Sequence, residues 1–212
     1  MPLVRKHAPV RTDAEAGDRS PVPHAGAADL RVRLVEGTPE ERYAAARLLA
    51  AMPEGADILG QALALEPDAR VREAIFAGLA RSSDAGAVDV LLRQLHSDDA
   101  GLRGGALDAL RAMPGRLRPY LEALLSDGDS DVRLLACDLL REQPDDVAAA
   151  LLPPLLDAET HANVCAAAVD VLAEVGDARS LPALQRCAAR FPREAFLQFA
   201  IRVAVGRIGG PP

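Results

Sequence analysis

Two side chains in the C-terminal half of the chain have the types and the spacing to do chemistry. His161 and Cys165 stand four residues apart, so on a helix they share one face. The imidazole could lower the pKa of the thiol and make it nucleophilic, or the two side chains could bind a metal ion together. Two ligands do not close a metal site, so folding would have to bring in a third ligand, another cysteine.

The remaining cysteines and the absent motifs limit what such a site could be. Cys137 and Cys187 complete a set of three cysteines without a CxxC spacing. This indicates reduced thiols in a cytoplasm rather than disulfides or a zinc or iron–sulfur site. The chain has no GxGxxG, P-loop, GxSxG or HExxH motif. We therefore expect no enzyme activity and no bound cofactor or metal.

The composition favours an acidic, helical protein. Half of the 212 residues are apolar, only 3% are aromatic and Trp is absent, which suits helices packed through Ala and Leu. The net charge of −7 disfavours nucleic acid as a partner, because phosphate contacts need a basic surface. No membrane helix or signal peptide is predicted. Lys6 is the only lysine among 24 basic residues, a usage typical of a high-GC bacterial genome.

One pattern recurs along the chain and predicts the fold. An acidic turn followed by Val-Arg, as in DSDVRLLACDLL, returns at intervals of 30, 31, 30, 32 and 33 residues. The anchor positions are Glu41, Val71, Leu102, Val132, Val164 and Leu197. Small or aliphatic residues follow each anchor after four and eight positions, which is one stripe of a helix. Each unit therefore begins with a helix that buries the same face.

A second apolar run follows each first helix after a short break, as in AVDVLLRQL (87–95) and PYLEALL (119–125). One helix pair cannot bury both faces alone, so neighbouring pairs must stack. This predicts an all-α, right-handed solenoid of about six helix pairs over residues 27–210. Residues 1–26, with Pro2, Pro9, Pro21 and Pro23, are predicted to form a flexible tail, which is either a terminus without a role or a docking peptide beginning MPLVRKHAPVR.

These units resemble HEAT repeats, in particular the short HEAT-like repeats named after phycobilisome lyases, which combine an acidic turn, Val-Arg, and Ala and Leu at helical spacing. The resemblance covers about residues 37–209 and ends with VAVGRIGG. It implies a helical solenoid whose second helices line a concave side. It implies little about activity, since proteins of this kind range from lyase-associated proteins to scaffolds.

Charged residues recur in register with the units. Asp68 and Arg72, Asp99 and Arg103, and Asp129 and Arg133 flank their anchors, with Thr38 and Arg42 in the first unit. We predict that they cap helices and pair between repeats, an Arg stripe for an anionic partner being the alternative. His161 and Cys165 replace this pair in the fifth unit, so drift from the pattern is the alternative to a thiol or metal site. Asp108, Asp138 and Asp170 form a second column, interpreted as a solvated face that would also suit a basic peptide.

Two local features add expectations. Gly101, Gly104 and Gly105 lie in one first helix, where glycine weakens a helix; close packing or a hinge would explain them. Pro153 and Pro154 predict a kinked or late-starting helix.

The function that follows is protein binding. We predict a non-catalytic scaffold, adaptor or assembly factor that binds a protein or peptide on the concave face. Arg and Tyr are frequent interface anchors, and the candidate contact residues are Tyr120, Arg116, Arg118, Arg93 and Asp89. The alternative is a cofactor- or metal-handling protein resembling bilin-lyase components, acting through Cys165 or Cys137.

Overall fold

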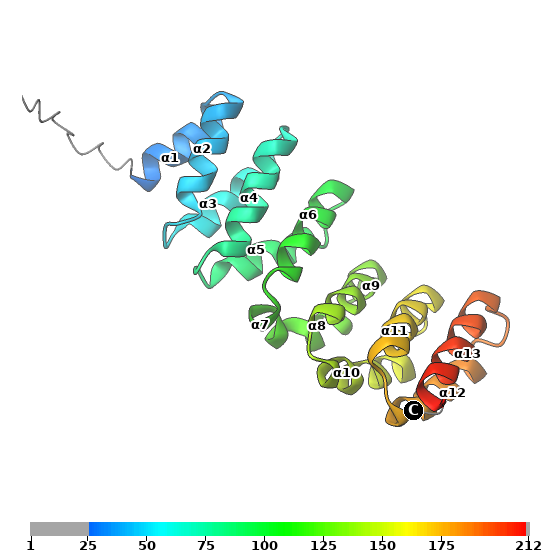
Figure 1. The fold of residues 1–212 in the computed structure, drawn as a ribbon. Helices are drawn as coiled ribbons and strands as arrows, with labels where there is room; N and C mark the ends of the chain where they lie inside the picture. The colour runs from blue at the N-terminus through cyan, green and yellow to red at the C-terminus, as the bar shows by residue number, and fades with distance from the viewer. Residues whose placement is uncertain (1–25, 211–212) are drawn as a thin grey trace, which may run out of the picture.

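The computed structural model describes residues 26–210, and helices are the only regular structure in this range (Figure 1). The first helices of the units are α2 (Pro39–Leu49), α4 (Ala69–Arg81), α6 (Ala100–Arg111), α9 (Ser130–Leu139), α11 (Ala162–Val175) and α13 (Ala195–Gly209). Each contacts the next in a continuous row. The predicted tail, residues 1–26, lies outside the described residues except for Gly26.

The second helices form the other layer of the array (Figure 1). They are α1 (Ala27–Glu36), α3 (Gly55–Leu63), α5 (Gly86–Gln94), α7 (Pro114–Leu117), α8 (Leu121–Leu125), α10 (Asp145–Ala158) and α12 (Leu181–Arg190). A 3₁₀ turn, Arg118–Tyr120, joins α7 to α8, and two more such turns, Leu140–Glu142 and Ala178–Ser180, lie next to α9 and α12. The predicted all-α solenoid of helix pairs is confirmed, and α1 precedes the first full pair as an additional second helix.

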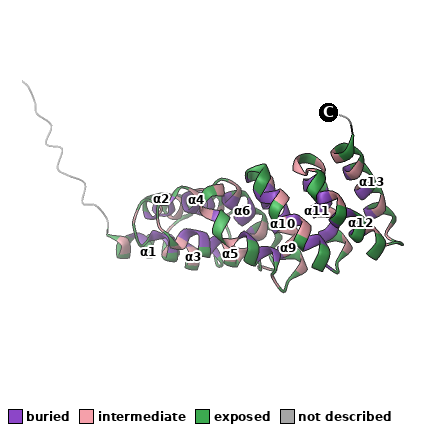
Figure 2. Ribbon diagram, turned by 90° about the horizontal axis from the view of Figure 1, so that it is seen from below, coloured by how far each residue is buried: buried purple, intermediate pink, exposed green. Residues whose placement is uncertain are grey.

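The core lies between the two layers, where the recurring stripe of the first helices is buried (Figure 2). All six residues four positions after an anchor are buried: Ala45, Ile75, Ala106, Ala136, Ala168 and Ile201. Burial of one Leu or Ile side chain contributes about 1.5–3 kcal/mol. Because each stripe packs on the neighbouring units, no pair of helices forms a core of its own.

Acidic and hydroxyl side chains begin four of the first helices, as predicted. Asp68, Asp99 and Asp129 accept hydrogen bonds from backbone N–H groups in the first turns of α4, α6 and α9. Thr38 and Glu41 form a reciprocal capping box at the start of α2. Such caps satisfy N–H groups that have no partner within the helix. His161 occupies the same place before α11, but its side chain caps nothing.

The glycines of α6 differ in their surroundings. A Cβ atom on Gly105 would lie 2.2 Å from Cε2 of Phe76 on α4, so close packing explains this glycine. A Cβ atom on Gly104 would meet nothing within 4 Å, so close packing does not explain that one.

The two prolines of α10 lie inside the helix, which begins at Asp145. The predicted late start is therefore wrong. Proline has no N–H, so each of the two prolines removes one hydrogen bond from the helix. Among the described residues, no helix is long and apolar enough to cross a membrane.

Candidate functional site

The recurring arginines of the first helices join neighbouring units. Arg42 donates from Nε and a terminal nitrogen to Glu66, both at 2.9 Å. Arg133 pairs with Glu159 in the same way, at 2.7 and 3.0 Å. A weaker version links Arg72 to Asp99 at 3.2 Å. The predicted pairing between repeats is confirmed for these three arginines, which reach forward to the next unit instead of forming an exposed stripe for an anionic partner. Arg103 departs from the pattern, because its guanidinium donates to the backbone carbonyl of Ser97 in the loop before its own helix.

Glu66 and Glu159 hold these junctions together, and the sequence pattern did not single them out. Their side chains are only 3% and 2% exposed. Glu159 also accepts from the backbone N–H groups of Thr160 and His161, both at 2.8 Å. Burial raises the pKa of Glu159, but the Arg133 hydrogen bond and the two N–H groups outweigh burial and leave the pKa below 4.5. Both glutamates stand five residues before the anchor of the next unit, and this shared position in the repeat would have identified them in the sequence.

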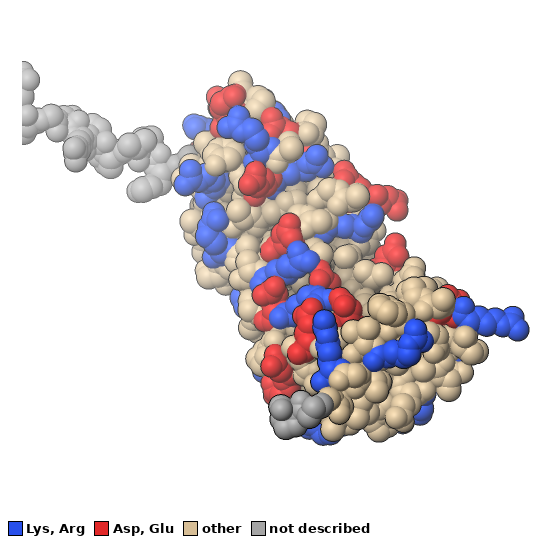
Figure 3. All heavy atoms as spheres, turned by 45° about the vertical axis from the view of Figure 1, so that its right-hand side comes forward, with Lys and Arg blue, Asp and Glu red and all other residues tan. Residues whose placement is uncertain are grey.

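The aspartate column of the first helices is not a free acidic surface. Arg111 lies between Asp108 and Asp138 and pairs with both. Arg141 extends this row of ion pairs by pairing with Asp138, Asp170 and Glu174. Figure 3 shows acidic and basic side chains alternating along this side of the molecule. The column therefore connects α6, α9 and α11, and its charges are largely compensated within the protein.

The structure places His161 and Cys165 in different surroundings. His161 is exposed and lines a shallow depression beside Asp131 and Phe196, whereas Cys165 is fully buried. The Cys187 thiol lies next to Cys165, and this neighbour together with burial raises the pKa of Cys165. Burial raises the pKa of Cys137 to about 12. No group of three His, Cys, Asp or Glu side chains in residues 26–210 is arranged to hold a metal ion.

The five predicted contact residues all belong to second helices or the turns beside them. Asp89 and Arg93 on α5 and Arg118 after α7 are exposed, and no ion pair engages them within the described chain. Tyr120 is half-buried against the core. Arg116 has another role, because its guanidinium donates to the backbone carbonyls of Ser82 and Asp84 in the preceding unit.

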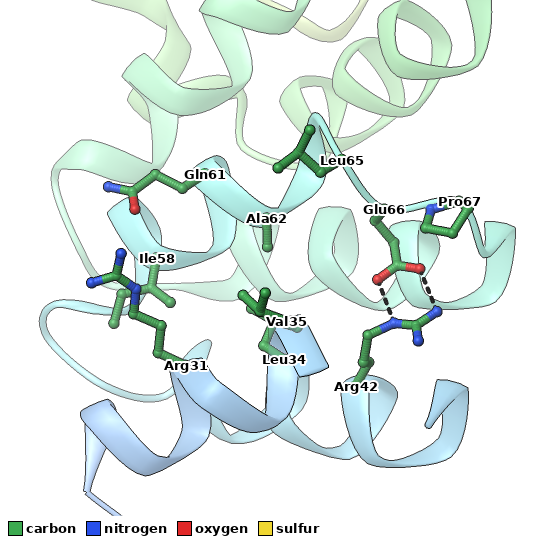
Figure 4. A pocket seen from close by; sticks show the side chains of 10 residues that line it. All are labelled: Arg31, Leu34, Val35, Arg42, Ile58, Gln61, Ala62, Leu65, Glu66 and Pro67. Atoms are coloured by element: carbon green, nitrogen blue, oxygen red, sulfur yellow. Dashed lines mark hydrogen bonds and ion pairs between the residues drawn. The ribbon is translucent and has the colours of Figure 1, made fainter. Parts of the chain in front are cut away.

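A pocket of about 380 Å³ lies where α1 meets α3. Leu34 and Val35 of α1 face Ile58 and Ala62 of α3, and Leu65 lies at its edge (Figure 4). The Arg42–Glu66 ion pair closes one side, and Arg31 and Gln61 flank the other. We call it the α1/α3 pocket.

A second pocket, of about 690 Å³, lies between α8 and α10. Its residues stand in the same repeat positions as those of the α1/α3 pocket, three units later along the chain. Leu125 replaces Leu34, Leu151 replaces Ile58, Leu155 replaces Ala62, Ala158 replaces Leu65, and Arg133 with Glu159 replaces Arg42 with Glu66. The fold thus builds one type of pocket twice.

The family comparison agrees with this repetition. Residues 117–206 match the family model of HEAT repeats. The matched segment runs from the end of α7 to α13 and is similar to HEAT repeats, and the helix pairs before it repeat the same arrangement. No curated protein sequence matches it.

Three solved structures illustrate what the helical array is similar to. One is an engineered protein, with a TM-score of 0.45, 20% identity and coverage of 87% of this chain and 99% of that chain. Another is a computationally designed armadillo repeat protein for modular peptide recognition, with a TM-score of 0.42, 17% identity and coverage of 86% and 100%. The third is the complex of CpcE and CpcF of phycocyanin lyase from Nostoc, with a TM-score of 0.37, 16% identity and coverage of 97% and 100%.

The units between the two pockets carry charged side chains at positions equivalent to the apolar ones of the pockets. Asp89 takes the repeat position of Ile58, and Arg93 takes that of Ala62. At the next junction His96 Nε2 lies 3.4 Å from Asp127 Oδ2, linking the end of α5 to the loop after α8. Beyond the α8/α10 pocket, Arg186 on α12 pairs with Asp157 on α10. Along the array, the second-helix face is therefore apolar at the α1/α3 pocket, charged at α5, and apolar again at the α8/α10 pocket.

Proposed function

We propose that this chain is a non-catalytic scaffold that binds a protein or peptide along its second helices, as an adaptor or assembly factor. The observation that carries the proposal is the contrast between the two faces. The arginines that recur at the unit junctions and along the aspartate column are engaged in pairs between units: Arg42, Arg72, Arg111, Arg133 and Arg141. The second helices instead present Asp89, Arg93 and Arg118 without ion pairs in the described chain, between two register-equivalent pockets.

This arrangement suits recognition of an extended partner. Two apolar pockets can each take an aliphatic side chain, while charged groups between them select the sequence that crosses α5 and α7. An ion pair between side chains of neighbouring elements closes one side of each pocket, and the walls are packed helices, so little ordering is needed on binding. Tyr120, half-buried beside exposed Arg118, offers an aromatic contact in the middle of this surface.

Affinity capture from a lysate of the native host, with mass spectrometry, would test the proposal. The variant Arg93→Glu/Arg118→Glu reverses two charges on the second-helix face. Arg47→Glu, an equally exposed change on α2, is the matched control on the first-helix face. We expect one protein to be enriched by the wild type and by Arg47→Glu, and to be lost with the double variant.

Two outcomes would contradict the proposal. Enrichment that survives the double variant but is lost with Arg47→Glu would move the binding site to the first helices. Absence of any enriched protein, with all three forms folded by circular dichroism, would remove the support for an adaptor. Tyr120→Ala should weaken capture without abolishing it, since truncation of an interface aromatic costs on the order of 1–2 kcal/mol or more.

A further inference from the structure

We propose that the N-terminal segment Leu3–Arg11 docks in the α8/α10 pocket of its own chain. This inference needs no second protein and is tested separately from the proposed function, but the docked segment would compete with a partner side chain for this pocket. It assigns an occupant to one of the two pockets and leaves the α1/α3 pocket open.

The α8/α10 pocket combines apolar walls with negative charge. Leu125, Leu151 and Leu155 form the walls. The positive charge of Arg133 is neutralised by Glu159 at 2.7 Å. Glu122, which is exposed, remains as an acidic group at the rim, and so does partly exposed Asp127, whose Oδ2 lies 3.4 Å from His96 Nε2.

A hydrogen-bond acceptor adds to this rim. The carbonyl of Ala150 would normally accept from the N–H of residue 154, or of residue 153 in a tighter turn. Both of these residues are proline and have no N–H. No other hydrogen bond to this carbonyl is formed within the described chain outside the helix. Ala150 is exposed and lines the pocket, so the position favours a cationic donor.

The start of the chain has the complementary chemistry. Leu3, Val4 and Val10 are aliphatic, and Arg5, Lys6 and Arg11 are basic. The first acidic residue of the chain is Asp13. An aliphatic side chain from this segment would enter the apolar part of the pocket while a neighbouring cation meets Glu122 or Asp127.

The connecting chain is long enough for this contact. Residues 12–25 separate the segment from α1, and 14 residues span at most about 46–50 Å when extended. The pocket begins at α8, which is three helices beyond α1 along the row of second helices. This distance is about 24–30 Å at the usual spacing of packed helices. Tethering gives a short segment a high effective concentration at a site within its reach.

The α1/α3 pocket provides an internal control for the charge argument. It has the same apolar positions, but Arg31 stands where the α8/α10 pocket has Glu122. A basic segment is repelled at Arg31 and attracted at Glu122. The two pockets therefore differ in sign at one equivalent position, and only the α8/α10 pocket suits the segment.

Lys6 makes a direct test possible, because it is the only lysine in the chain. A carbodiimide joins an amine to a carboxylate in contact with it, without a spacer. We would treat the dilute full-length protein with the carbodiimide and map the cross-links of Lys6 by mass spectrometry. We expect them to concentrate on Glu122 and Asp127 within monomers, and to decrease as added salt screens the contact.

A pair of equivalent variants separates docking from chance proximity. Ala158→Arg adds a positive charge at the mouth of the α8/α10 pocket, and Leu65→Arg adds it at the same position of the α1/α3 pocket. Both positions are exposed, so both variants should fold. We expect Ala158→Arg to reduce the yield of Lys6 cross-links to Glu122 and Asp127 roughly ten-fold, and Leu65→Arg to leave it unchanged.

Other results would overturn the proposal. Lys6 cross-links spread evenly over exposed carboxylates, or insensitive to Ala158→Arg, would show that the segment does not occupy the pocket. Cross-links found only in covalent dimers would assign the pocket to the segment of a second copy. Either result leaves the capture experiment with Arg93→Glu/Arg118→Glu unaffected, so failure of this inference is distinct from failure of the proposed function.

Discussion

Buried charged side chains depend more than other residues of this protein on having specific hydrogen-bond partners. Glu159 accepts two hydrogen bonds from Arg133 and two from backbone N–H groups, and its side chain is almost fully buried. A buried charge is tolerated only when every lone pair finds such a partner. Removal of the Glu159 charge leaves the Arg133 guanidinium, whose side chain is 13% exposed, without its counterion.

We therefore expect Glu159→Gln to lower the free energy of unfolding at neutral pH by about 1–3 kcal/mol. The pKa of Glu159 in the folded protein lies below the ordinary 4.5. The ionised Glu159 side chain therefore makes its full contribution to the free energy of unfolding above pH 4.5. This contribution is lost as the pH falls through the lower pKa that Glu159 has in the folded protein. Urea unfolding at a series of pH values should show the difference from the wild type shrinking in acid. The exposed Glu142→Gln is the control, and a difference that persists in acid would contradict this account.

The neighbouring glycines of α6 allow a matched prediction. Gly104→Ala places a methyl group in open space, so helix propensity should raise stability by up to about 1 kcal/mol. Gly105→Ala drives a methyl group into the Phe76 ring, and overpacking typically costs about 1–3 kcal/mol. Thermal unfolding should shift in opposite directions for the two variants. A stabilised Gly105→Ala would mean that α4 and α6 separate easily, as in the hinge interpretation.

The thiols should be inert in the folded protein. Cys137, Cys165 and Cys187 are all free and buried, so a reagent in solvent does not reach them. Burial also raises the pKa of Cys137 to about 12, whereas the neighbouring Cys165 thiol lowers the pKa of Cys187, which is protected by its burial alone. Only the thiolate reacts rapidly with disulfide reagents. We expect Ellman's reagent to modify no cysteine of the native protein and three after unfolding in denaturant. One thiol that reacts quickly in the native protein would favour the cofactor- or metal-handling alternative.

At the scale of helices, the ion pairs along α6, α9 and α11 act as a network that links units weakly. Arg141 contacts Asp138, Asp170 and Glu174, but Asp170 is 67% exposed. Exposed pairs of this kind contribute about 0.2–1 kcal/mol. A double-mutant cycle of Arg141→Ala and Asp170→Ala should give a coupling energy in that range, which decreases with added salt. A coupling energy above about 2 kcal/mol that does not change with added salt would contradict the prediction.

The helices were predictable from the sequence because their signals are local. The anchor spacing, the buried stripe and the Asp caps lie within one turn or one helix, so DARVREAIFAGL alone predicts most of α4. The partners of Arg42 and Arg133 were not identified, because Glu66 and Glu159 lie more than 20 residues away and become neighbours only when units stack.

The candidate surface was predictable only in part for the same reason. Asp89, Arg93 and Arg118 were expected on the second helices, and the structure exposes them there. Arg116 was expected beside them, but its guanidinium holds the loop of the preceding unit. The α1/α3 and α8/α10 pockets need two helices each, and no single segment contains the residues that line them.

The whole molecule is a one-dimensional array, so its units need not unfold together. The principal contacts of α4 are with α2, α3, α5 and α6, and those of α11 are with α9, α10 and α13. The row of first helices is thinnest between α6 and α9, where the packing is less extensive than between α9 and α11. In such arrays stability is approximately a sum over units and their interfaces.

Core deletions in the two halves should therefore have local effects. Leu79→Ala on α4 and Leu172→Ala on α11 each remove a fully buried side chain, at a cost of about 2–5 kcal/mol. Hydrogen exchange followed by mass spectrometry should show faster amide exchange across α2–α6 in the first variant, with α11–α13 unchanged, and the reverse in the second. The boundary should fall between α6 and α9, where the coupling between units is weakest. A uniform increase along residues 26–210 would instead show that ion pairs such as Arg111–Asp138 are strong enough to make the array unfold as one unit.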